Sequence, residues 1–432
     1  MRFHRWILRT LVLVAFLGPG CSARAGAELD SSEEELRAAI FARADPMRET
    51  LRSWVGINTG SWNGVGLERF ARMLGDELRE LGFQVVVNPG VPLELPGREG
   101  ATTGPMVVAQ TAGPAHPRFL LIGHIDTVFE PDSSFQTFGL DPDDPEKARG
   151  PGTVDMKGGL VILLETLRAL RSRGDLSRAA FTVLLNSDEE IGSLGSRAVI
   201  EEQARTADYG FVFESARSSG AMVRSRRGLG QFHLSVRGVA AHAGSAHEKG
   251  RSAVLELAGK IVRIEALTDY EGGVTVNVGT LEGGTKRNIV PAQASAWIDV
   301  RYDRLELGSE LRSRIEEIAR TRIVEGTTTR VWGRLHRPPK VETDGTRRLL
   351  SLHAEVAEDL GLELPPPVHA GGGTDGSLTA AQGLATLDSM GPVGGGAHTE
   401  REFVLLPSLA ERAALAAVLL HRLIERPVSS AR

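Results

Sequence analysis

The sequence predicts an α/β fold into which a smaller α+β domain is inserted. Short apolar segments with the length of buried strands alternate with amphipathic helical segments in residues 28–227. Residues 228–337 instead show the order strand, helix, strand, strand, helix, which is typical of a small α+β sandwich. Several apolar strands of the first part end in acidic residues, at the place where open α/β sheets bind their ligands.

Length and charge set the broad class of protein. At roughly 150 residues per domain, 432 residues predict two or three domains with a substantial core. Charged residues make up 24% of the chain, and its formal net charge is −5. A nucleic-acid-binding surface would be strongly basic, so we expect no nucleic-acid partner.

Residues 1–27 have the pattern of a secretory signal peptide, which predicts a secreted or periplasmic protein. The apolar run at residues 10–17 is too short to span a membrane as a helix, and small residues at 23–27 offer cleavage sites. The only cysteine, Cys21, follows Gly18 by three places, whereas lipoproteins usually have an aliphatic residue there. Lipid anchoring at Cys21 is therefore the less favoured alternative, and the mature chain needs no disulfide.

The first part of the chain predicts helices followed by three strands. Apolar spacing is helical from Ser31 to Leu81, where Gly82 stops it. Strands are expected at 83–87, 107–110 and 119–125. Within the insert we expect further strands and helices, at residues 231–236, 253–264, 274–281, 294–300 and 311–323.

The third strand ends in His124, with Asp126 two residues further on. A period of two places both side chains on the same side of the strand end. This spacing suits a metal-bound imidazole with an acid that fixes its orientation. A core histidine with a neighbouring acid is an equally good interpretation of this segment alone.

Asp155 stands in a glycine-framed loop, residues 149–159, that leads into an amphipathic helix at 160–170. Such a loop could cradle an anion at the helix N-terminus, but it lacks the Gly-Lys-Ser/Thr of a phosphate loop. The strand 180–185 leads into the acidic triplet 188–190, where one carboxylate could bind a cation while its neighbour handles a proton. A solvated acidic turn is the alternative.

Two further candidate ligands follow. Glu214 ends the apolar strand 209–213, and His398 lies in the glycine-rich loop 391–400. Taken in order, the motifs at His124, Asp155, the acidic triplet, Glu214 and His398 resemble those of the two-zinc exopeptidases typified by glutamate carboxypeptidase, with aminoacylases and desuccinylases as relatives. The resemblance runs from about residue 48 to 426.

The resemblance implies a zinc-exopeptidase-like catalytic domain with a mixed central sheet, formed by residues 28–227 and 338–432. Residues 228–337 would form an inserted α+β sandwich that acts as the lid and dimerisation domain, so the resemblance implies a homodimer. It also implies a cis peptide bond between Asp155 and Met156.

The resemblance also assigns the metal ligands and implies two zinc ions per chain. Asp155 would bridge the ions, His124 and Glu214 would complete the ligands of one, and Glu190 and His398 those of the other. Imidazole nitrogen and carboxylate oxygen suit zinc, which agrees with this division.

The catalytic residues implied by the resemblance are Glu189 as general base, Asp126 as the acid supporting His124, and His242 from the insert. The resemblance implies that Asn288, Arg337 and Gly373 bind substrate, with Arg337 receiving its carboxylate. Without the metal motifs, a solvated His242, a surface ion pair at Arg337 and a simple turn at Gly373 would be preferred.

These residues predict a secreted zinc carboxypeptidase that removes a C-terminal amino acid, with glutamate as a candidate, from a small peptide or N-acyl amino acid. An N-acyl-amino-acid amidohydrolase, a desuccinylase or an aminopeptidase of the same fold remain alternatives. A catalytically silent metal- or peptide-binding protein is an alternative of another class, although it would have no need of Glu189 beside Glu190. The side-chain preference is not predicted.

Overall fold

The computed structural model describes residues 28–114 and 116–428. The predicted signal peptide and Cys21 lie outside the described residues. Within the described part of the chain, no helix combines the length and the apolar character needed to cross a membrane.

A six-stranded mixed sheet forms the centre of the larger domain, as predicted. Its strand order is β1-β2-β6-β3-β7-β16, in which β2 pairs antiparallel with both β1 and β6, and the neighbours from β6 to β16 pair in parallel. The strands are β1 (Gln84–Asn88), β2 (Met106–Gln110), β3 (Arg118–His124), β6 (Ala180–Asn186), β7 (Tyr209–Val212) and β16 (Thr386–Leu387). Because β3, β6 and β7 are parallel, their carboxyl ends meet at one edge of the sheet.

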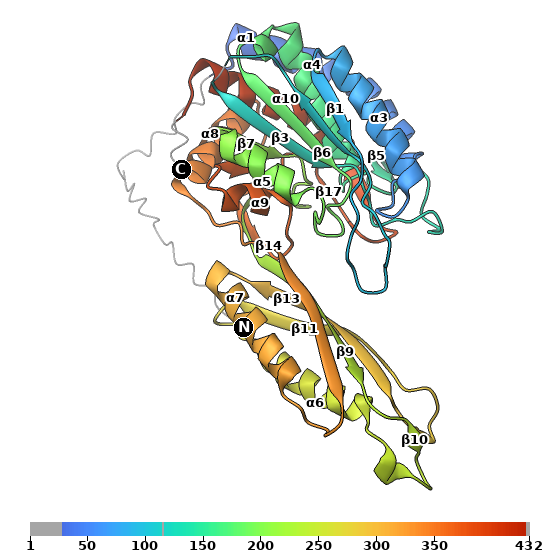
Figure 1. The fold of residues 1–432 in the computed structure, drawn as a ribbon. Helices are drawn as coiled ribbons and strands as arrows, with labels where there is room; N and C mark the ends of the chain where they lie inside the picture. Colours follow the sequence, from blue (N-terminus) through green and yellow to red (C-terminus); the bar gives the residue numbers. More distant parts are fainter. Residues whose placement is uncertain (1–27, 115, 429–432) are drawn as a thin grey trace, which may run out of the picture.

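Helices cover both faces of this sheet (Figure 1). Alternate β3 residues point to opposite cores: Phe119 and Leu121 to the larger, Leu120 and Ile122 to the smaller. Helices packed in the larger core are α1 (Ser31–Phe41), α2 (Ala44–Val55), α3 (Gly64–Glu80), α4 (Lys157–Ser172), α8 (Asp344–Asp359) and α10 (Pro407–Glu425). Those in the smaller core are α5 (Arg197–Thr206) and α9 (Asp375–Ala381).

The helical pattern predicted from Ser31 to Leu81 is interrupted between α2 and α3, where residues 56–63 are not helical. Helix α2 ends where the buried ammonium of Lys157 donates hydrogen bonds to the backbone oxygens of Trp54 and Ile57, at 3.1 and 2.7 Å. Gly60 then forms a parallel bridge with Thr127, close to the end of β3. The Lys157 ammonium thus satisfies carbonyl oxygens at the end of the helix that have no partner in a further turn.

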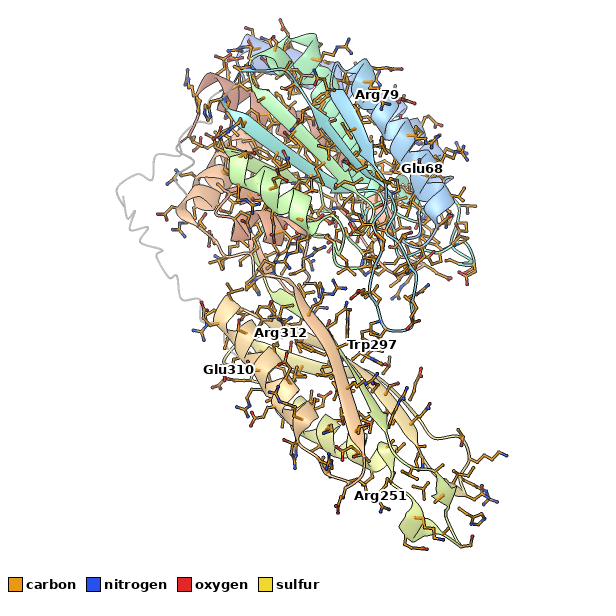
Figure 2. All side chains as sticks on the ribbon, viewed as in Figure 1. Glu68, Arg79, Arg251, Trp297, Glu310 and Arg312 are labelled. Carbon is orange, nitrogen blue, oxygen red and sulfur yellow. The ribbon has the colours of Figure 1, made fainter. Side chains whose placement is uncertain are left out.

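The smaller domain is a four-stranded antiparallel sheet with α6 (Ala253–Glu265) and α7 (Leu305–Arg320) packed on one face. Figure 2 shows Glu310 and Arg312 on α7, with Trp297 on the other side of the sheet. The strand order is β11 (Val274–Gly283), β13 (Gln293–Tyr302), β9 (Gly228–Arg237) and β14 (Thr328–Arg337). Strand β14 was not predicted, because it is an edge strand whose sequence is mostly polar.

The remaining strands are short, and two 3-10 helices accompany them. At the far end of the smaller domain, β10 (Ala241–His242) pairs with β12 (Ile289–Val290) (Figure 1). In the larger domain, a second sheet has the order β17 (Gly394–Gly395), β18 (Phe403–Leu405), β5 (Asp144–Arg149), β4 (Gly139–Asp141). Strand β8 (Val223–Arg226) pairs in parallel with β15 (Val368–Ala370), and the 3-10 helices are η1 (Asp175–Ser177) and η2 (His247–Lys249).

Candidate metal centre

Asp155 is placed between two histidines that come from distant parts of the chain. Its Oδ1 lies 3.1 Å from Nε2 of His124, at the end of β3. Its Oδ2 lies 3.2 Å from Nε2 of His398, in the loop between β17 and β18. The peptide bond to Met156 is cis, as the sequence resemblance implied. The two oxygens of one carboxylate therefore face two separate imidazoles.

Each histidine has a second carboxylate of its own. Nε2 of His124 lies 3.4 Å from Oε1 of Glu214, which follows β7. Nε2 of His398 lies 3.1 Å from Oε2 of Glu190, which follows β6. The result is two groups, each with one imidazole and one carboxylate, that share Asp155. Five of the residues singled out in the sequence are thus brought together.

The charges of these groups are mutually dependent. Burial, with the charge of Asp155, raises the pKa of Glu190 to about 7. Hydrogen bonds to Asp155 and Glu190 raise the pKa of His398 to about 11. Burial alone would lower the pKa of His124, but Glu214 and hydrogen bonds to carboxylates raise it well above its usual value. Several buried carboxylates lie close together here, and their negative charges require nearby positive charge. Such a cluster is suited to binding cations.

The donor set fits zinc. It consists of imidazole nitrogens and carboxylate oxygens, both of which zinc accepts at short range. The ligand atoms of His124, Asp155 and Glu190 all lie within 4.8 Å of one another, and so do those of His124, Glu189 and Glu214. Both groups contain His124 and neither contains His398, so they mark a metal position around His124. A second position, beside His398, is indicated by the distances from its Nε2 to Asp155 and Glu190.

Asp126 supports this cluster mainly through the acidic loop. Its two carboxylate oxygens each accept, at 3.2 Å, a backbone N–H of Glu189 or Glu190, and Oδ2 also accepts from the Ser61 hydroxyl at 2.8 Å. Nδ1 of His124 lies 3.0 Å from the backbone oxygen of Asp126 and 3.4 Å from its Oδ1. Asp126 thus orients His124 and also fixes the turn that carries both glutamates.

Glu189 is distinguished from Glu190 by its partner. Nη2 of Arg337 donates to Oε1 of Glu189 at 2.7 Å and to its backbone oxygen at 3.2 Å. Burial raises the pKa of Glu189 well above its usual value, and the guanidinium opposes that shift. Because a cation already occupies Oε1, Glu189 is less suited to a metal than Glu190.

Arg337 is almost completely buried, with 2% of its surface exposed, so it is not a surface ion pair. Its Nη1 lies 3.2 Å from Oδ1 of Asp375, yet without the geometry of a hydrogen bond. Gly373 packs against it: a Cβ there would lie 3.1 Å from Cγ of Arg337 and 2.3 Å from Leu229. A larger residue at Gly373 would therefore displace the arginine.

His242 and Asn288 lie together, but not at the metal centre. The backbone N–H of Ala243 donates to the backbone oxygen of Asn288 at 3.0 Å, and His242 on β10 pairs with Ile289 on β12. Both residues are exposed and belong to the tip of the smaller domain, far from the large sheet in Figure 1. Within one chain, the structure does not bring them to Asp155.

Glu402 is a functional candidate that the sequence analysis missed. Its carboxylate is fully buried and accepts backbone N–H groups of Gly152, Val154 and Asp155, at 3.2, 2.9 and 3.1 Å. Burial, with the charge of Asp155, raises the pKa of Glu402 to about 8. This side chain ties the loop after His398 to the loop of Asp155. A lone acid 247 residues from its partner gives no sequence signal.

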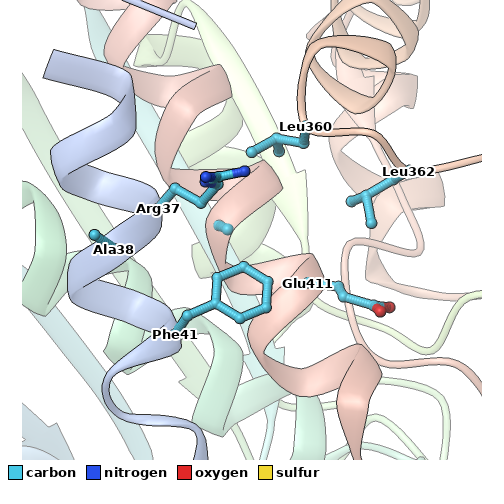
Figure 3. Close-up of a pocket in the computed structure, with 7 residues that line it drawn as sticks. Arg37, Ala38, Phe41, Leu360, Leu362 and Glu411 are labelled. Atoms are coloured by element: carbon cyan, nitrogen blue, oxygen red, sulfur yellow. The ribbon is translucent and has the colours of Figure 1, made fainter. Parts of the chain in front are cut away.

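A surface cavity of about 300 Å³ lies elsewhere, between α1, α10 and the segment after α8 (Figure 3). Its lining is mostly apolar and consists of Arg37, Ala38, Phe41, Leu360, Leu362, Glu411 and Ala414. None of the candidate site residues contributes to it, so we do not connect it with the chemistry of the metal centre.

Comparisons with known proteins agree with this geometry. Residues 120–422 match the family model described as peptidase family M20/M25/M40. Carboxypeptidase G2 of Pseudomonas sp. (strain RS-16) is 29% identical over 424 residues, covering 96% of this chain and 97% of the relative.

Solved structures share the fold. An M20 family metallo-carboxypeptidase from Sulfolobus solfataricus superposes with a TM-score of 0.70 and 18% identity, covering 87% of this chain and 98% of that one. A Bacillus subtilis protein described as a dinuclear metal binding peptidase gives 0.58 and 17%, covering 88% and 99%. The family match spans most of the chain and includes every metal-ligand candidate, and the chain therefore belongs to peptidase family M20/M25/M40.

Proposed function

We propose that this protein is a secreted, zinc-dependent carboxypeptidase that removes a C-terminal amino acid, with glutamate as the first candidate, from small peptides or N-acyl amino acids. One observation carries the proposal: Asp155 is shared by two histidine–carboxylate groups, and Glu189 with Arg337 stands beside them. The similarity to carboxypeptidase G2 supports removal of a C-terminal residue.

In this proposal His124, Glu214, Glu190 and His398 hold two zinc ions on either side of Asp155. Zinc bound there would polarise the scissile carbonyl and lower the pKa of the attacking water. Glu189 takes a proton from that water and passes it to the leaving amine. Burial raises the pKa of Glu189, which makes its carboxylate form a stronger base.

Arg337 would bind the free carboxylate of the substrate. Nη2 already bonds Glu189 and the buried Nη1 lies 3.2 Å from Asp375, so the substrate carboxylate would have to take the place of Asp375 beside Nη1. Gly373 leaves the space in which the arginine packs, and its loop would line the substrate site. A carboxylate bound next to Glu189 would place the preceding amide bond at the metal centre.

We also propose that the enzyme is a homodimer in which the tip of one chain completes the site of the other. His242 and Asn288 lie far from Asp155 in their own chain (Figure 1). A two-fold dimer formed through the smaller domains would place each tip near the partner's metal centre. His242 would there donate to the oxyanion that develops during the attack.

Export is proposed from residues 1–27, which have the pattern of a secretory signal peptide. N-terminal sequencing of the protein recovered outside the cytoplasm tests it. A mature N-terminus after Ala25 or Ala27 is expected. Lipid-modified Cys21 at the N-terminus would favour the anchored alternative instead.

Metal content and substrate polarity test the proposed reaction. Close to two zinc ions per chain and loss of hydrolysis with a chelator are expected. Amidating the substrate's C-terminus leaves Arg337 without its partner and should lower kcat/KM by at least about thirtyfold, which corresponds to roughly 2 kcal/mol. Equal rates on free and amidated substrates would indicate an aminopeptidase, and metal binding without hydrolysis a silent binding protein.

A further inference from the structure

The face of the smaller sheet opposite α6 and α7 carries a cluster of three rings. His233, Trp297 and Trp332 come from the adjacent strands β9, β13 and β14, and both tryptophans lie opposite His233 in register. Ring centroids of His233 and Trp297 are 4.6 Å apart, and those of the two tryptophans 5.7 Å. The guanidinium of Arg334 lies 5.2 Å from the Trp332 ring. We call these rings the aromatic cluster.

The aromatic cluster does not belong to the hydrophobic core of its domain. Alternate residues of β9, such as Phe232 and Leu234, point the other way and are buried under the helices. Trp297 and Trp332 remain partly exposed. Large aromatic side chains that are left half-exposed together often mark a binding surface.

One end of this face adjoins the candidate active site. His336, on the same strand as Trp332, packs against the turn after Glu190, since a Cβ on Gly192 would lie 3.1 Å from its ring. On β13, which β9 separates from β14, Nη1 of Arg301 donates to the backbone oxygen of Gly371 at 3.1 Å. Both contacts connect the open face to the loops that hold Glu189 and Gly373.

The aromatic cluster lies at a defined distance from the reacting groups. Trp332 precedes Arg337 by five residues on β14, which corresponds to roughly 17 Å along a strand. An extended peptide covers this distance in about five residues. A substrate whose C-terminal carboxylate is bound at Arg337 could therefore reach the aromatic cluster only if it extended about five residues upstream.

The face is also recessed beyond the aromatic cluster. A cavity of about 690 Å³ continues from His233 towards the tip, and its lining includes Ser235, Glu282, Ser295 and Ile289. The open face thus has contacts to the loops of the metal centre at one end and a cavity beyond His233 at the other. This shape suits an elongated ligand better than a flat contact.

We propose that the aromatic cluster binds an aromatic side chain of the substrate, about five residues before the scissile bond. The inference rests on the proposed function for its reaction, but the binding surface is separate from the metal centre. Trp297 and Trp332 supply ring faces for stacking, and Arg334 favours rings with negatively charged substituents. The preferred substrate is thus a peptide with an upstream aromatic residue.

The test uses peptides that end in glutamate and carry a single tryptophan at successive positions, with alanine elsewhere. The KM should be lowest when the tryptophan stands about five residues upstream, by roughly fivefold relative to the all-alanine peptide. Trp297→Leu and Trp332→Leu should each reduce this advantage towards one. Tyr270→Leu, an exposed aromatic change in the same domain, should preserve it.

Binding is measured separately from hydrolysis. In the Glu189→Gln protein, a peptide carrying 4-nitrophenylalanine at the preferred position should quench tryptophan fluorescence, and Trp297→Leu with Trp332→Leu should abolish the saturable part. Quenching without any hydrolysis by the wild-type protein would contradict the proposed function but would still support binding at the aromatic cluster. Equal KM values for all tryptophan positions would overturn the inference. So would a monomer in either leucine variant, since the face would then be an interface between copies.

Discussion

The metal centre and the tip of the smaller domain differ in how their residues are held. At the metal centre, Asp126 and Glu402 accept backbone N–H groups from loops 63 and 247 residues away. At the tip, Nδ1 of His242 accepts only from Gly244 and Ser245, at 3.1 and 3.2 Å. The side chains of the first region are fixed by contacts between distant segments, whereas the His242 imidazole is held by its own turn, although the backbone of β10 pairs with β12.

The difference bears on what each region can do alone. Buried, long-range hydrogen bonds hold the ligands of the metal centre in place before any ligand arrives, which is what catalysis requires. An exposed histidine on the two-residue strand β10 gains a fixed environment only from something that packs against it. We therefore expect the metal centre to respond to changes in its own chain, and the tip to act through another chain.

The largest expected effect separates the two adjacent glutamates. Glu189→Gln should keep both metal ions and lower kcat by at least about a hundredfold, because it removes the proton acceptor. Glu190→Gln should instead weaken binding of one metal, because it removes a ligand beside His398. Metal analysis and steady-state kinetics on both variants test this assignment. Equal metal loss in the two would contradict it.

A smaller effect is expected at Glu402, which positions Asp155 without touching substrate. Glu402→Ala leaves three buried N–H groups without an acceptor and should weaken metal binding by about ten- to a hundredfold. Glu402→Gln keeps an oxygen for Val154 and Asp155 and should lose only a few-fold.

The readout is zinc affinity by competition with a chelator, alongside thermal unfolding of the metal-free protein. Glu400→Ala, an exposed change in the same loop, is the control and should leave affinity unchanged. A merely structural role would lower the unfolding temperature while zinc affinity stayed the same. That outcome would remove Glu402 from the positioning of Asp155.

Mixing two inactive proteins tests the tip. Glu189→Ala and His242→Ala chains should each be inactive alone. If His242 acts on the partner's site, half of the dimers after random exchange are mixed and each contains one intact site. About a quarter of wild-type activity should then return. Exchange shown by mass spectrometry without any recovery would mean that His242 acts in its own chain or not at all.

The sequence was most informative where chemistry coincides with local pattern. His124, Glu214 and the acidic triplet each end an apolar strand, and parallel strands bring their ends together. Glu402 and the end of α2 at Lys157 depend on partners far along the chain, which no local pattern reveals. Strand β14 was missed for a related reason: an edge strand with an open face need not be apolar.

The smallest expected effect concerns the ion pair of His421 with Asp175, outside the metal centre. Nδ1 of the buried His421 lies 2.9 Å from Oδ2 of Asp175, 246 residues away, and Arg178 also contacts that carboxylate. The hydrogen bond to Asp175 raises the pKa of His421, although burial opposes it. A raised histidine pKa adds stability that is fully present below the unfolded-state pKa of about 6.5 and is lost as pH rises through the folded value.

We therefore expect His421→Gln to lower the free energy of unfolding by about 1 kcal/mol near pH 5.5 and by much less near pH 9. Asp175, whose pKa is lowered, stays ionised across this window and does not reverse the sign. Denaturant unfolding at the two pH values measures the difference. His247→Gln, an exposed change at the tip, is the control and should change the free energy of unfolding little. If both variants behaved alike, long-range burial would not be what distinguishes the two regions.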